Sequence, residues 1–122
     1  MKPSFTTEVY NPDRLIAGDE NIITRDETLI TGQNLKRGAL LGKITASGKL
    51  TLSLAAAVDG SEVPFGILVD DIDATAADKV APMYMKGEFD EGEMTFGTGH
   101  TADSVRDGLR RLGIHMKTSV PA

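Results

Sequence analysis

The side chains that could carry chemistry are few in this sequence. The 122-residue chain has no Cys and only two histidines, His100 and His115. A zinc site needs three or four ligands in which nitrogen or sulfur is well represented. The lack of Cys also excludes disulfides and cysteine nucleophiles. The sequence therefore predicts no metal centre built on histidine or cysteine.

Carboxylates gather in two stretches, and these are the strongest remaining candidates for a metal or acid–base site. Calcium sites use such carboxylates, but the ordered spacing of an EF-hand loop is missing. General acid–base catalysis needs a defined pair of groups, and nothing in the spacing singles one out. We interpret both stretches as solvated loop charge that also protects strand edges. They consist of Asp70, Asp71, Asp73 and Asp78, and of Glu88, Asp90, Glu91 and Glu93.

Nucleophile and phosphate-binding motifs are also missing. No serine lies in a G-x-S-x-G elbow, and Gly97-Thr98-Gly99 lacks the residues that complete a phosphate loop. We therefore expect a binding or structural protein with no catalytic residue and no cofactor. A small β-barrel enzyme that uses carboxylates, and a ligand-binding β module with an apolar pocket, are the alternatives from other functional classes.

Composition limits the partners. The net charge is −5 and the pI about 4.9, so the chain repels phosphate backbones and nucleic acid is not expected as a partner. No apolar run is long enough to span a membrane, and residues 1–5 lack the apolar stretch of a signal peptide. These features predict one domain made and used in the cytoplasm, with no membrane partner.

The elements expected from about residue 28 onward are mostly β-strands. Residues 39–45 and 49–54 predict a hairpin around Gly48, because glycine readily adopts the positive φ of a tight turn. Residues 64–69 and 80–89 predict two more strands, and residues 114–120 a last one. Pro82 argues that its strand starts late, lies on an edge or carries a bulge. In that strand Ala81, Met83, Met85 and Phe89 are expected on one face.

One helix is expected late in the chain. Val105, Leu109 and Leu112 recur at helical spacing. Thr101 or Ser104 can cap the start of this helix, and Gly113 can end it. The predicted fold class is therefore mainly β, a small β-barrel or β-clip-like domain over residues 28–122 with one helix in the C-terminal half.

Residues 1–27 differ from the rest of the chain. They show neither helical nor strand periodicity, yet apolar side chains are scattered through polar ones. This pattern is typical of an extended arm that becomes ordered on a partner, for example by adding a strand to a sheet edge. A flexible tail without such a role is the alternative.

The order of several short motifs resembles a known family. Leu35 to Leu50, Asp59-Gly60-Ser61, Pro64 to Leu68, Tyr84 to Phe89 and Leu109 to Lys117 follow one another as in the lambda-type bacteriophage head decoration proteins. The resemblance covers roughly residues 5 to 120.

The resemblance implies a non-enzymatic cement protein of the virion. Such proteins form homotrimers on the outer surface of the expanded head and stabilise it against the internal pressure of packaged DNA. The implied partners are the major capsid protein and other copies of this chain, and no cofactor is implied. Another virion component, from the tail or from head completion, is the structural alternative. Carried onto this sequence, the capsid-binding residues fall in the arm: Phe5, Val9, Tyr10, Pro12, Leu15 and Ile16.

Overall fold

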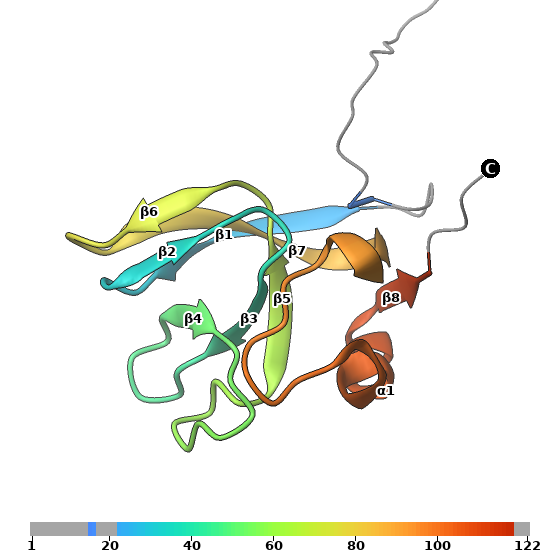
Figure 1. Cartoon of the computed structure of the whole chain (residues 1–122). Coiled ribbons are helices and arrows are strands. Elements are labelled where there is room, and N and C mark those ends of the chain that lie inside the picture. Colours follow the sequence, from blue (N-terminus) through green and yellow to red (C-terminus); the bar gives the residue numbers. More distant parts are fainter. Residues whose placement is uncertain (1–14, 17–21, 119–122) are drawn as a thin grey trace, which may run out of the picture.

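The computed structural model describes residues 15–16 and 22–118, and it is mostly β with a closed five-stranded barrel (Figure 1). Strands β1 (Ile23–Leu29), β4 (Leu50–Leu52), β3 (Leu40–Lys43), β5 (Pro64–Leu68) and β7 (Lys79–Asp90) pair in that order, and β1 pairs again with β7 to close the barrel. The expected fold class, a β-barrel with one helix in the C-terminal half, is confirmed.

The remaining elements are attached to this barrel. A two-stranded sheet joins β2 (Gln33–Leu35) to β6 (Ile72–Ala74). The 3₁₀ turn η1 (Glu91–Glu93) follows β7, and helix α1 (Ala102–Leu112) leads into β8 (Ile114–Lys117), which runs parallel to the end of β7. In Figure 1 the β2–β6 pair and α1 lie on opposite sides of the barrel. Within the described ranges, no helix has the length and apolar character needed to cross a membrane.

The barrel wall is buried on both faces. Leu40, Ile67 and Tyr84 pair across β3, β5 and β7 and point toward α1. Leu68 and Met83 form the adjacent pair and point into the barrel. Two core clusters result. The helix-side cluster contains Leu15, Leu40, Ile67, Tyr84, Phe89, Met94, Val105, Leu109 and Ile114. The barrel cluster contains Leu29, Ala39, Leu41, Leu50, Leu68, Ala74, Ala81 and Met83.

The predicted hairpin and helix are confirmed. Strands β3 and β4 are antiparallel, and Gly48 between them has φ +73°. Thr101 caps α1 and Gly113 ends it with φ +92°. Strand β4 is shorter than expected and ends at Leu52, so that Leu54 is 41% exposed and does not continue its apolar face.

Strand β7 carries a β-bulge, one of the three alternatives expected from Pro82, but the bulge lies at Met85. The strand differs from the expectation in its start and in the face of Phe89. It starts at Lys79, before Pro82, whose carbonyl accepts the Val69 N–H just beyond β5. The nitrogen of a strand residue faces the same side as its carbonyl, so the nitrogen of Pro82 also faces the chain just beyond the end of β5. The missing N–H therefore removes no hydrogen bond from the ladder between β7 and β1. Phe89 does not share a face with Ala81, because the register against β1 slips by one residue at Met85 and a β-bulge reverses the alternation beyond it.

Strand β1 begins before the domain boundary expected after residue 27. This strand pairs with β7 from Ile23 to Leu29, so residues 23–27 take part in the barrel sheet. The division into an arm and a body stays a prediction.

Candidate functional site

The start of the described chain lies against the end of β7. Leu15 is 1% exposed and belongs to the helix-side cluster. Its carbonyl accepts the N–H of Asp90 at 2.6 Å, and Ile16 forms an antiparallel bridge with Phe89. On the other side of β7, Phe89 pairs with Met116 of β8. The N-terminal segment and the last strand therefore flank the same stretch of β7.

The structure places two of the six expected capsid-binding residues. Leu15 is buried and Ile16 partly buried, and both pack in the helix-side cluster. Phe5, Val9, Tyr10 and Pro12 lie outside the described residues. Leu15 is therefore not presented to a partner in this structure. Its scattered neighbours in the sequence gave no periodicity that could have identified it as a core residue.

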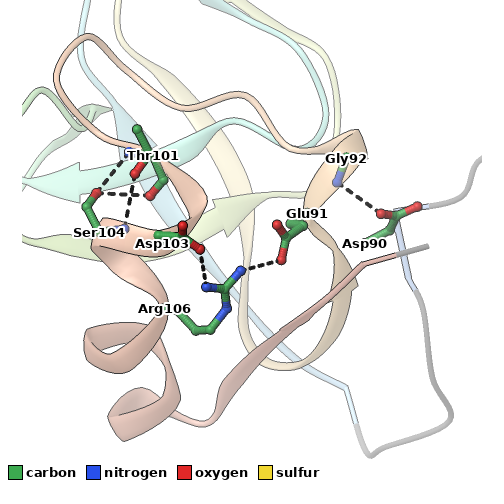
Figure 2. Close-up of polar contacts among 7 residues, drawn as sticks. All are labelled: Asp90, Glu91, Gly92, Thr101, Asp103, Ser104 and Arg106. Carbon is green, nitrogen blue, oxygen red and sulfur yellow. Dashed lines mark hydrogen bonds and ion pairs between the residues drawn. The ribbon is translucent and has the colours of Figure 1, made fainter. Parts of the chain in front are cut away.

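Helix α1 is fixed to the end of β7 by charged groups (Figure 2). Arg106 donates to Glu91 of η1 at 2.7 Å and to Asp103 at 2.5 Å. These two carboxylates raise the pKa of the Arg106 guanidinium above its usual value, with the Asp103 hydrogen bond as the largest cause. At the helix start, Thr101 and Ser104 form a reciprocal capping box. The arrangement orients α1 over the helix-side cluster.

A serine and a histidine meet in the structure, although their positions in the sequence did not suggest it. Ser53 Oγ lies 3.1 Å from His100 Nε2, which also lies 3.1 Å from the carbonyl of Glu62. A carbonyl only accepts, so a hydrogen bond to Glu62 requires the tautomer with the proton on Nε2, and in that tautomer Nε2 cannot take a proton from Ser53. The Ser53 hydroxyl is fully buried and donates to the carbonyl of Ser61. This pair joins two loops and has the wrong geometry for nucleophilic catalysis.

The acidic stretches are engaged in local contacts. Asp73 accepts from the hydroxyl and N–H of Thr75, which lowers the pKa of its carboxyl. Glu88 pairs with Lys117 at 2.5 Å. Asp90 is 4% exposed and accepts the Gly92 N–H at 2.9 Å. Over the described ranges, no three His, Cys, Asp or Glu side chains are grouped so that they could hold a metal ion.

A shallow groove of about 330 Å³ lies between β1 and the turn before β4. Its lining is largely polar and charged: Asp26, Glu27, Thr28, Ser47, Gly48, Lys49 and Val80. A ligand-binding module would show an enclosed apolar pocket instead. The geometry of this groove therefore does not favour the ligand-binding alternative.

Comparison with known proteins gives the family. The family model of bacteriophage lambda head decoration protein D matches residues 4–116 of the 122-residue chain. No curated protein matches the chain. The family match supports a phage head decoration role, places the protein on the virion capsid and points to a structural protein rather than an enzyme. The resemblance found in the sequence is thus confirmed, and the chain belongs to the bacteriophage lambda head decoration protein D family.

Proposed function

We propose that this protein is a capsid cement: three copies associate and bind the major capsid protein on the expanded head, which they stabilise against the pressure of packaged DNA. The observation that carries the proposal is the family match over residues 4–116, because it includes both the barrel and most of the N-terminal segment. Synthesis in the host cytoplasm and the absence of a nucleic-acid partner belong to the same proposal.

The construction of the body supports a mechanical role. The barrel closes on itself through β1 and β7, which removes most exposed sheet edges. Two core clusters lie on either side of the β3–β5–β7 wall. Such a body deforms little under load, because close-packed interiors have low compressibility.

Phe5, Val9, Tyr10 and Pro12 are the proposed capsid contacts. They combine apolar and aromatic side chains with a proline that limits strand pairing to a short extended segment. Three such segments on one trimer would multiply weak contacts through avidity. A preference for the expanded shell requires a docking surface that exists only in that state.

A mixing assay tests the proposal. Purified protein is sedimented with expanded and with unexpanded shells, as the full chain and with residues 1–12 removed. We expect the full chain to bind expanded shells and the truncated form to lose at least about ten-fold in affinity, the equivalent of 1.4 kcal/mol. Equal binding by both forms would exclude the arm from the mechanism. Equal binding to both shells would exclude the dependence on expansion.

Two further measurements test the trimer and its location on the shell. Analytical ultracentrifugation of the free protein should give the mass of three 13.0 kDa chains, and a monomer at all concentrations would contradict a trimer that forms before it binds the shell. Electron microscopy of virions with a label at the C-terminus should show label across the shell. Label confined to the tail or the portal would favour another virion component.

A further inference from the structure

The N-terminal segment has a second attachment to the body besides β1. Leu15 is buried in the helix-side cluster, its carbonyl accepts the Asp90 N–H at 2.6 Å, and Ile16 bridges Phe89. Residues 15 and 16 thus contact a strand that lies more than seventy positions away in the sequence.

We propose that Leu15 and Ile16 form a fixed root that positions the arm. This inference rests on the proposed function, in which residues N-terminal to the root contact the capsid. Leu15 is then a positioning residue and makes no capsid contact itself. The root fixes the point from which the arm starts at the end of β7, on the side opposite β8. Without the root, the first described attachment of the chain would be β1 at Ile23.

The expected effect on capsid binding follows from the length of the tether. The first described attachment of the chain to the body is at residue 15 with the root in place, and at the start of β1 without it, so 14 or 22 residues precede the attachment. The effective concentration of a tethered group falls roughly as the −3/2 power of tether length, so losing the root lowers it about two-fold per arm. For three arms bound together, the loss is about eight-fold.

The root also predicts a signature in the free protein. The Asp90 amide donates to Leu15, so its hydrogen exchange reports opening of the root. Truncation of a buried leucine to alanine costs at least ~2 kcal/mol, which corresponds to a rise of roughly 30-fold in exchange at Asp90. The exposed Leu112, which is 47% accessible, provides a matched control, and Leu112→Ala should leave this amide within a few-fold of wild type.

The decisive experiment compares Leu15→Ala with Leu109→Ala, both in the full chain. Leu109 is buried in the same cluster but lies on α1, so both variants weaken the body to a similar extent. We expect only Leu15→Ala to weaken binding to expanded shells, by about eight-fold. Equal losses in both variants would mean that Leu15 acts only through stability, and the root would be excluded.

Two further measurements of Asp90 protection can overturn the root. If Leu15→Ala does not fold, chains lacking residues 1–12 and residues 1–16 are compared instead. Only the latter should lose protection at Asp90, and equal protection in both would overturn the root. Loss of Asp90 protection on capsid binding would also overturn it, because Leu15 would then leave the core. These measurements on the root differ from the test of the arm: if removal of residues 1–12 leaves capsid affinity unchanged, the arm is excluded from capsid binding, while Asp90 exchange still reports whether Leu15 is attached to the body.

Discussion

Arg37 lies between β2 and β3 and contacts Tyr84 of the helix-side cluster. Replacing Arg37 tests how much these contacts stabilise the core. Its guanidinium donates to the Val69 carbonyl and to the Tyr84 hydroxyl, each at 2.8 Å. It also lies 5.6 Å from the centre of the Tyr84 ring. Tyr84 is 5% exposed, so a lost partner for its hydroxyl would not be replaced freely by water.

The magnitude follows from these contacts. Hydrogen bonds that involve a charged group contribute about 1.5–3 kcal/mol each, and an unsatisfied buried hydroxyl costs about 1–3 kcal/mol. A cation–π contact at a partly exposed site adds about 0.5–1 kcal/mol. Side-chain ordering offsets part of this sum, so we expect Arg37→Met to lower the free energy of unfolding by about 2–4 kcal/mol.

A double-mutant cycle with Tyr84→Phe separates the shared interaction from the rest. Tyr84→Phe should cost about 1 kcal/mol. The double variant should be more stable than the sum of the single effects predicts, by about 1–2 kcal/mol, because the phenylalanine leaves no hydroxyl to satisfy. Urea unfolding with a constant m-value provides the measurement. Effects that add within about 0.5 kcal/mol would refute the reasoning.

Lys43 and Phe65 provide the control for this cycle. The Lys43 ammonium lies 4.9 Å from the centre of the Phe65 ring, and phenylalanine has no hydroxyl to lose. The coupling energy of this pair should be no larger than about 1 kcal/mol. A coupling as large as that of Arg37 and Tyr84 would indicate that the Tyr84 hydroxyl contributes little.

Four further predictions concern single positions. Gly42→Ala should destabilise the protein by more than about 2 kcal/mol in urea unfolding, because its Cβ would collide with a backbone carbonyl of the facing loop. Gly108→Ala in α1 should instead stabilise it by about 0.5–1 kcal/mol, since the space around it is open. Thr101→Ala should remove the capping box and cost about 0.5–2 kcal/mol. Asp78 has its pKa lowered first by its hydrogen bond with Lys49; its contribution to stability is therefore present above pH ~4 and lost as the pH falls through the folded-state pKa. Asp78→Asn should flatten the fall of the melting temperature in acid, and an unchanged slope would contradict the assignment.

Local signals in the sequence determined several elements of the fold. The turn at Gly48 and the start and end of α1 depend on conformational preferences of single residues and on side chains a few positions away. Such signals act without the rest of the fold. They were sufficient to predict the β3–β4 hairpin, the helix and the mainly β class.

Long-range contacts decided what the sequence left open. The alternation along β7 predicted one face for Ala81 and Phe89, but the slip against β1 at Met85 divides them between the two clusters. Only tertiary pairing fixes the position of a bulge, because both strands contribute to it.

The N-terminal segment shows most clearly what the sequence determined and what the tertiary structure decided. Its composition by itself indicated an arm, and the family match covers it from residue 4. Nothing in its pattern distinguished Leu15 from the proposed contact residues, because one leucine without periodicity carries no information about burial. The site that buries it is built from β7, α1 and β8. Burial is a property of that assembled surface, so only the tertiary structure could show that Leu15 belongs to the core.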